Sequence, residues 1–100
     1  MTDINASEMA GRLKLPDPAK ILDVREPIEF HTWNIGGINV PLGALEQDLD
    51  RLGWNKNDEI IVVCRAGIRS ATAKSILELN GFKNIRNLTG GLLALQRIRS

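Results

Sequence analysis

An apolar run, Ile60–Val63, is followed at once by the chain's single cysteine, Cys64, and then by a short basic loop. Four consecutive Ile and Val residues without polar alternation are typical of a strand buried on both faces, as in a parallel sheet. Beyond the loop, residues 70–80 are amphipathic and rich in Ala and Leu, which predicts a helix. A buried strand, a tight loop and a helix in this order favour a layered α/β fold.

The rest of the chain alternates between the same two kinds of element. We predict strands over 20–24, 38–41, 59–64 and 84–88, and helices over 6–15, 26–31, 42–52, 70–80 and 90–98. The helix over 42–52 rests on four leucines at helical spacing, with Gly53 as its stop. The fold class is therefore α/β, a central and mainly parallel β-sheet with helices on both faces. In such sheets ligands bind beyond the carboxyl ends of the strands.

Composition and charge argue against nucleic-acid binding, membrane insertion and a metal site. A chain of 100 residues suits one domain over 1–100, and its net charge of +1 gives no electrostatic reason to expect nucleic acid as a partner. No segment approaches the ~20 apolar residues that span a membrane, and the N-terminus lacks the pattern of a signal peptide. One cysteine and one histidine disfavour a metal site. We expect a cytoplasmic protein without a structural metal site.

The residues around Cys64 favour its thiolate form. Arg65 and Arg69 place positive charge nearby, Gly67 permits the positive φ of a tight loop, and the following helix presents free N–H groups. Ser70 either donates its hydroxyl to the sulfur or caps the helix. A lone cysteine that ends an apolar strand is more often a small buried hydrophobic residue. A purely structural cysteine, however, does not need two arginines and a glycine directly after it.

Four segments, taken in chain order, resemble the signatures of one family. They are Leu22–Pro27 with Glu29 and Phe30, then Asn39–Leu42, then Cys64–Ser70, and finally Gly81–Phe82 through Asn87–Gly91. Each motif alone is weak, but the four in this order resemble single-domain rhodanese-like sulfurtransferases. The resemblance covers about Ile21 to Leu95, which is most of the chain.

The resemblance implies a reaction and its residues. Cys64 would accept a sulfane sulfur as a persulfide and pass it to a nucleophilic acceptor, which is cyanide in assays and a thiol or a protein in cells. The substrate-binding residues would be Arg65, Ala66, Gly67, Ile68 and Arg69, with Ser70, Asp23 and Arg25 in support. Backbone amides of the loop would hold the sulfur, and the two loop arginines would attract a small anionic donor, with thiosulfate favoured. The family needs no metal or organic cofactor.

The sequence allows two alternative functions, and the first, a cysteine phosphatase, is disfavoured by the length of the loop between Cys64 and Arg69. Four residues separate Cys64 from Arg69, whereas cysteine phosphatases use five, so the shorter loop favours a single sulfur atom over a phosphate. A second alternative is a partner-dependent sulfur carrier or interaction module with little activity on free thiosulfate. The sequence does not identify the physiological donor, the acceptor or the oligomeric state.

Some residues outside the loop depart from the family pattern, and others have two possible roles. The segment Trp33–Ile38 replaces the usual Gly-His-Ile and Gly-Ala pattern and is one residue shorter, which affects the expected substrate preference. Leu95 stands where the family often has a tryptophan, and we interpret this change as a different packing of side chains in the core. Asp23 and Arg25 either orient the loop as an ion pair or organise the end of the sheet, and we favour the second role. His31 is expected on an exposed helix face.

Overall fold

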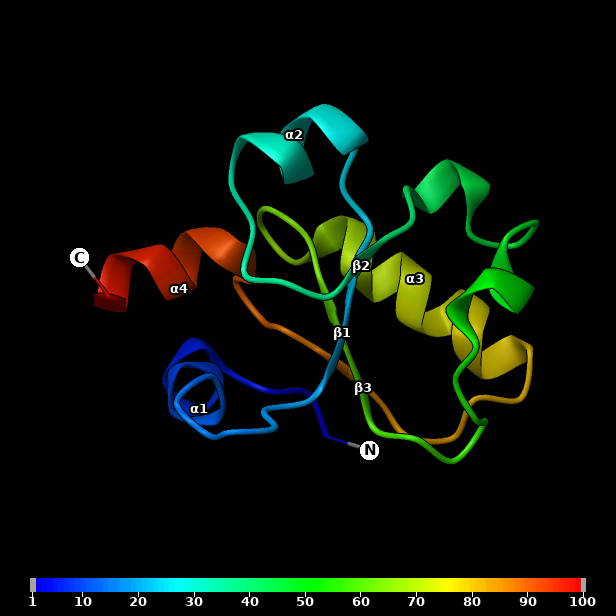
Figure 1. The fold of residues 1–100 in the computed structure, drawn as a ribbon, viewed down its shortest axis with the longest axis horizontal. Coiled ribbons are helices and arrows are strands. Elements are labelled where there is room, and N and C mark those ends of the chain that lie inside the picture. The colour runs from blue at the N-terminus through cyan, green and yellow to red at the C-terminus, as the bar shows by residue number, and fades with distance from the viewer. Residues whose placement is uncertain (1, 100) are drawn as a thin grey trace.

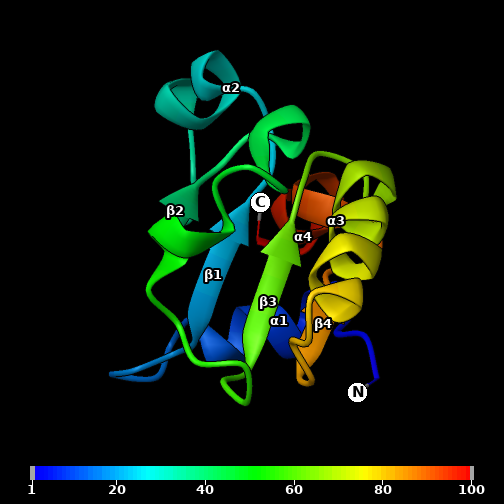
Figure 2. The same cartoon turned by 90° about the vertical axis from the view of Figure 1, so that its right-hand side faces the viewer.

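A sheet of four parallel strands, in the order β2-β1-β3-β4, forms the centre of the computed structural model, which describes residues 2–99 (Figures 1 and 2). The strands are β1 (Lys20–Asp23), β2 (Ile38–Asn39), β3 (Ile60–Val63) and β4 (Ile85–Asn87). Because all four run the same way, the segments that follow β1 and β3 emerge at one edge. The predicted α/β fold with a parallel sheet is confirmed.

The central strand β3 explains the apolar run in the sequence. All four of its residues are buried, and their side chains alternate between two hydrophobic clusters on opposite faces of the sheet. Ile60 and Val62 join one cluster, whereas Ile61 and Val63 join the other. The same alternation puts Cys64 in the cluster of Ile60 and Val62, so the thiol points to the face covered by α3.

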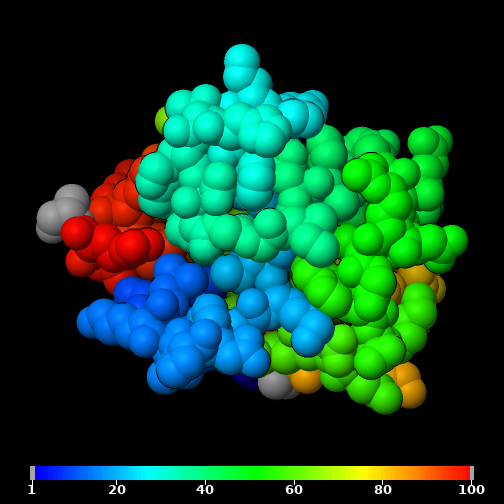
Figure 3. All heavy atoms as spheres, viewed as in Figure 1, coloured from blue at the N-terminus to red at the C-terminus, as the bar shows by residue number. Residues whose placement is uncertain are grey.

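Helices cover both faces of the sheet, as the sequence predicts (Figures 1 and 2). They are α1 (Ala6–Arg12), α2 (Pro27–Thr32), α3 (Ile68–Leu79) and α4 (Gly91–Arg99). Helix α3 packs on β3 and β4 from one side, while α1 and α4 pack against each other on the opposite side. Helix α2 stands beyond the carboxyl ends of the strands and forms a ridge along that end of the molecule (Figure 3).

The predicted helix over 42–52 is wrong. This region forms two short 3₁₀ helices, Leu42–Ala44 and Leu49–Leu52, joined by a turn. The leucines lie three residues apart within each half, a spacing that fits a 3₁₀ helix because residues i and i+3 share one side of it. Leu45 and Leu52 are buried as the pattern requires. Leu42 and Leu49 are partly buried against the same hydrophobic cluster, so the apolar spacing marks the side that packs inward although the backbone is not one α-helix.

Residues near the N-terminal ends of α1 and α2 explain where these helices begin. Asn5 caps α1, since its side chain accepts a hydrogen bond from the Glu8 backbone N–H at 2.8 Å and the Glu8 side chain accepts one in return from the Asn5 N–H. Pro27 occupies the first turn of α2, where its missing N–H costs nothing. Within residues 2–99, every helix is too short or too polar to cross a lipid bilayer.

Two leucines on α3 test this packing. Leu77 is fully buried against the sheet, whereas Leu79, two residues on, is 87% exposed. We expect Leu77→Ala to lower the free energy of unfolding by about 2–5 kcal/mol, since it leaves a cavity in the core. The matched variant Leu79→Ala should change it by less than about 0.5 kcal/mol. Urea denaturation of both variants measures the difference, and equal effects would contradict this placement of α3.

Candidate functional site

Cys64 lies directly after β3, at the carboxyl edge of the sheet, and its side chain is buried. The chain around it is held from the opposite side by the start of α4. The Leu92 N–H donates to the Cys64 carbonyl at 2.9 Å, and the Leu93 N–H donates to the Arg65 carbonyl at 3.0 Å. Two segments that are distant in sequence therefore fix the backbone on either side of the thiol.

Gly67 and Gly91 allow the start of α4 to lie directly against the loop after Cys64. A Cβ at Gly91 would collide with the carbonyl group of Arg65, because the start of α4 passes directly against the loop. Gly67 has a φ of +93°, in the left-handed region that favours glycine, and it precedes the first residue of α3. The Gly90–Gly91 pair thus serves both as the entry to a helix and as the contact surface for the loop.

Hydrogen-bonding groups of Gly67 and Ser70 converge on the sulfur. The backbone N–H of Gly67 donates to Cys64 Sγ at 3.1 Å, and that of Ser70 donates at 3.3 Å. The Ser70 hydroxyl lies 3.2 Å from the same sulfur. Helix α3 begins at Ile68, two residues earlier than the sequence predicts, and its N-cap is Gly67. Of the two roles considered for Ser70, the structure therefore shows the contact with sulfur and not the cap.

These contacts shift the ionisation of the thiol. Burial by itself raises the pKa of Cys64, because it disfavours the charged form. Hydrogen bonds from the Ser70 hydroxyl and from the backbone N–H groups of Ser70, Gly67 and Ala66 outweigh burial, so the pKa of Cys64 lies below its usual value. The site therefore gives Cys64 a larger thiolate fraction than an ordinary cysteine has at the same pH.

Arg69 has a partner that the sequence analysis did not identify. Its guanidinium forms a two-pronged ion pair with Glu29 on α2, with Nη1–Oε1 at 2.6 Å and Nη2–Oε2 at 3.0 Å. The hydrogen bonds from Arg69 are the main reason that the pKa of Glu29 falls to about 2. Glu29 therefore stays ionised, and it offsets much of the positive charge that Arg69 was expected to offer an anionic donor.

Asp23 and Arg25 form a buried pair at the end of β1. Arg25 Nη2 lies 2.8 Å from Asp23 Oδ2, and its Nε lies 3.0 Å from Asp23 Oδ1. The same guanidinium donates to the Trp33 carbonyl at 2.8 Å, which anchors the segment after α2. Asn39 Nδ2 donates to the carbonyls of both Asp23 and Arg25. These bonds link the end of β1 to β2 and to the segment after α2.

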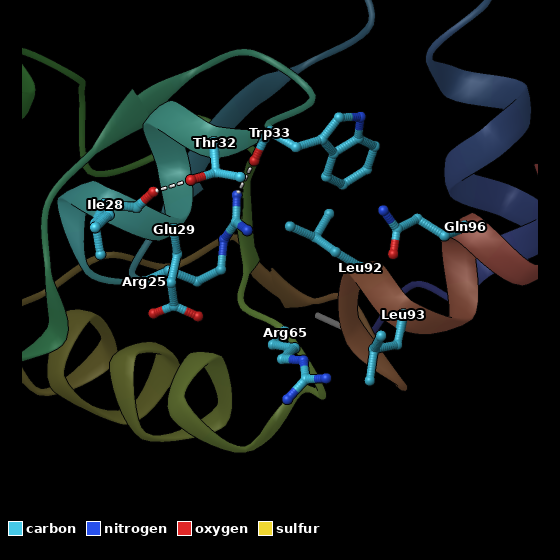
Figure 4. Close-up of a pocket in the computed structure, with 9 residues that line it drawn as sticks. All are labelled: Arg25, Ile28, Glu29, Thr32, Trp33, Arg65, Leu92, Leu93 and Gln96. Atoms are coloured by element: carbon cyan, nitrogen blue, oxygen red, sulfur yellow. Dashed lines mark hydrogen bonds between the residues drawn. The ribbon is translucent and has the colours of Figure 1, made fainter.

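A pocket of about 330 Å³ opens beside the loop (Figure 4). Its walls come from α2, the loop and α4, and consist of Arg25, Ile28, Glu29, Thr32, Trp33, Arg65, Leu92, Leu93 and Gln96. Trp33, from the segment that departs from the family pattern, faces Leu92 across the pocket. Arg65 is exposed, and no carboxylate among residues 2–99 pairs with its guanidinium. Arg65 is thus the loop cation available to an incoming anion.

The structure adds two residues to those predicted from the sequence. Glu29 belongs to a motif we had noted, but nothing local indicated that it would meet Arg69 forty positions later. Asn87 on β4 hydrogen-bonds to the Ser70 hydroxyl and to the Gly67 carbonyl. Its position before the Gly90–Gly91 pair was the only available signal. Among the predicted residues, Ile68 is 77% exposed and its side chain points away from the sulfur. His31 is exposed, as expected.

Fold and site together define a class, namely a parallel α/β domain that presents an acidified cysteine thiol within a cradle of backbone amides. A family model for the rhodanese-like domain matches residues 5–97. The chain belongs to the rhodanese-like family. A rhodanese-like domain protein of Staphylococcus aureus has the same fold, with a TM-score of 0.83 and 30% identity over 95% of this chain and 91% of that one.

Curated relatives carry several descriptions. The thiosulfate sulfurtransferase PspE of Escherichia coli is 33% identical over 78% of this chain and 77% of its own length. A Bacillus subtilis protein named "Putative sulfur carrier protein YrkF" is 33% identical over 90% of this chain. A tRNA uridine(34) hydroxylase of Buchnera aphidicola is 33% identical over 77% of this chain. This chain spans 48% of YrkF and 26% of the hydroxylase, so these relatives contain further sequence.

The contact between α4 and the loop can be tested with two glycines that share a φ of +65°. A Cβ at Gly53 would meet no atom within 4 Å, whereas one at Gly91 would collide with Arg65. Gly53→Ala should lower the free energy of unfolding by about 1–2 kcal/mol through backbone strain alone. Gly91→Ala should lower it by about 1–3 kcal/mol more, since packed backbone must also move.

Urea denaturation measures this difference, and amide NMR signals report on the loop. The signals of Arg65 and Ala66 should shift in Gly91→Ala and stay in place in Gly53→Ala. Equal stabilities and unchanged loop signals in both variants would show that α4 does not support the loop.

Proposed function

We propose that this protein transfers sulfane sulfur through a persulfide formed on Cys64, with thiosulfate as its donor. The observation that carries the proposal is the convergence of the Gly67 and Ser70 N–H groups on a sulfur whose pKa is lowered. A cradle of backbone donors stabilises negative charge on the sulfur without a metal ion. Membership of the rhodanese-like family and the similarity to PspE support this chemistry.

The proposed reaction is a double displacement. The Cys64 thiolate attacks the outer sulfur of thiosulfate, a new S–S bond forms, and the bond within the donor breaks as sulfite leaves with its electron pair. A nucleophilic acceptor, cyanide or a thiolate, then attacks the outer sulfur of the persulfide. The Cys64 thiolate leaves and is ready for another cycle. No electrons are gained or lost overall, so no external oxidant or reductant is needed.

Each loop residue has a role in this proposal. The backbone N–H groups of residues 65–69, including Ala66, Gly67 and Ile68, would surround the outer sulfur of the persulfide. Arg65, exposed at the pocket, would attract the donor dianion. Arg69 would hold the loop against α2 through Glu29 rather than meet the donor directly. The four residues between Cys64 and Arg69 enclose a smaller space than a phosphatase loop, which favours sulfur over phosphate.

A second candidate is a sulfur carrier that exchanges sulfur with a protein partner and uses free thiosulfate poorly. The pairing of Arg69 with Glu29 favours it, since only Arg65 is then available to recruit a small dianion. Ile28 and Ile68, each 77% exposed beside the loop, offer apolar contacts to a larger partner. The similarity to YrkF also supports it. For either function we place the chemistry in the cytoplasm, where thiols stay reduced.

The nucleophile is tested by mass spectrometry of the intact protein and by turnover of thiosulfate with cyanide. The wild-type protein should gain the mass of one sulfur atom, localised to Cys64, and should produce thiocyanate. Cys64→Ser should lose both, because a hydroxyl cannot form the persulfide. Turnover that survives in Cys64→Ser would contradict the assigned nucleophile. Absence of any added sulfur in the wild-type protein, with thiosulfate or with an organic persulfide, would overturn sulfur transfer altogether.

The donor is tested by removing the available cation. Arg65→Gln should lower kcat/KM for thiosulfate about 10-fold, mainly through KM, and the loss should shrink at high salt because the attraction is electrostatic. Arg51→Gln makes the same charge change on the exposed helix Leu49–Leu52 and should have no effect. Equal kcat/KM in the wild-type and Arg65→Gln proteins would contradict recruitment by Arg65. Sulfur loading without measurable thiosulfate turnover would favour the carrier function.

A further inference from the structure

The Ser70 hydroxyl lies between two groups that compete for its hydrogen. Ser70 is fully buried, and its Oγ lies 3.2 Å from Cys64 Sγ on one side. On the other side it forms a short hydrogen bond to Asn87 Oδ1. A hydroxyl has one hydrogen to donate and two lone pairs that accept. Ser70 can therefore donate to the sulfur or to Asn87, but it cannot donate fully to both.

Contacts around Asn87 determine which atom of its side chain faces Ser70. Asn87 Nδ2 donates to the Gly67 carbonyl at 3.2 Å, and a carbonyl can only accept. The amide NH₂ must therefore face Gly67, which leaves Oδ1, an acceptor only, directed at Ser70. The backbone of Asn87 is held in turn, since its N–H donates to Asp3 Oδ1 at 3.0 Å. Asn87 is buried, so water does not readily replace these partners.

We propose that Asn87 is a positioning residue that draws the Ser70 hydroxyl hydrogen away from Cys64 and thereby favours the protonated thiol. In the thiol state all three groups are satisfied. The Cys64 S–H donates to Ser70 Oγ, the Ser70 O–H donates to Asn87 Oδ1, and the Asn87 NH₂ donates to Gly67. The proposal rests on the proposed function only in taking Cys64 as the reactive group.

Ionisation changes this arrangement. The thiol proton leaves to solvent, and the Ser70 hydroxyl turns to donate to the negative sulfur. Asn87 Oδ1 then loses its donor while still buried, which carries a free-energy cost. Asn87 therefore opposes the stabilisation that Ser70 offers the thiolate. The backbone N–H groups of Gly67 and Ser70 point at the sulfur in both states, so they do not share this competition.

Charged groups near the site do not account for the same effect. Arg69 on α3 interacts electrostatically with Cys64 and is paired with Glu29 from α2. Arg65 in the loop lines the adjacent pocket, and Asp23 and Arg25 pair with each other at the end of β1. On the far side of Asn87, Asp3 is paired with Lys74. Substituting the neutral Asn87 with a neutral residue leaves every one of these charges in place. A change in ionisation would therefore pass through the hydrogen bonds of Asn87, which reach Ser70 and Gly67, and a Ser70→Ala background separates these two routes.

Alkylation of Cys64 by iodoacetamide across a range of pH tests the proposal, because the chain contains one cysteine and the assay needs no sulfur donor. Asn87→Leu keeps a similar side-chain volume and removes the competing acceptor. We expect the pH midpoint of alkylation to fall, and the rate below that midpoint to rise about threefold, since a larger thiolate fraction outweighs the lower nucleophilicity of a more acidic thiol. In a Ser70→Ala background the same Asn87→Leu change should leave the midpoint unmoved.

Three outcomes would overturn the proposal. They are an unchanged midpoint in Asn87→Leu, a raised midpoint, or an equal fall in the Ser70→Ala background, which would show an effect that bypasses Ser70. If Asn87→Leu fails to fold, an NMR titration of the wild-type protein tests the proposal instead. The NMR signals of the Asn87 carboxamide should then shift at the Cys64 midpoint, and the shift should be much smaller in Ser70→Ala. Because persulfide formation is not measured, failure here leaves the proposed sulfur transfer standing.

Discussion

The contact between the start of α4 and the backbone after Cys64 is the interaction on which the site depends. It positions the Cys64 and Arg65 carbonyls through two hydrogen bonds from α4, and a side chain at Gly91 would require this packed backbone to move. With those carbonyls held from behind, the N–H groups of the loop and of the first turn of α3 are free to point at the sulfur. A segment near the C-terminus therefore shapes a cradle that is otherwise built from residues 64–70.

The three arginines at the site differ in their contacts, since two form ion pairs within the fold and one is exposed at the pocket. Arg25 is paired with buried Asp23, and Arg69 is paired with Glu29, so both guanidinium groups join elements of the fold. Arg65 remains exposed at the pocket. Such a division suits the proposed recruitment of an anionic donor by Arg65, because a cation that holds the structure together is partly neutralised by its partner.

Sequence reasoning succeeded wherever a local pattern carried the information. The alternation of strands and helices predicted the parallel sheet, and the apolar run predicted a strand buried on both faces. It failed over 42–52, because leucines at spacings of three and four residues fit an α-helix and also two 3₁₀ turns. It missed Glu29 as the partner of Arg69 and Asn87 as the partner of Ser70. Those pairs join residues 40 and 17 positions apart, and no local pattern encodes such contacts.

By itself the sequence determined the family, the layered fold and the identity of Cys64 as the candidate nucleophile, because motif order and apolar periodicity are properties of the chain. The tertiary structure alone decided which partners Ser70 and Arg69 have and which cations remain available. Hydrogen bonds and ion pairs depend on distances of about 3 Å, and only packing brings α2, β4 and α4 that close to the loop. The cysteine could be found from its neighbours in sequence, and the groups that lower its pKa lie within six residues of it. The partners of Ser70 and Arg69, in contrast, come from distant segments of the chain.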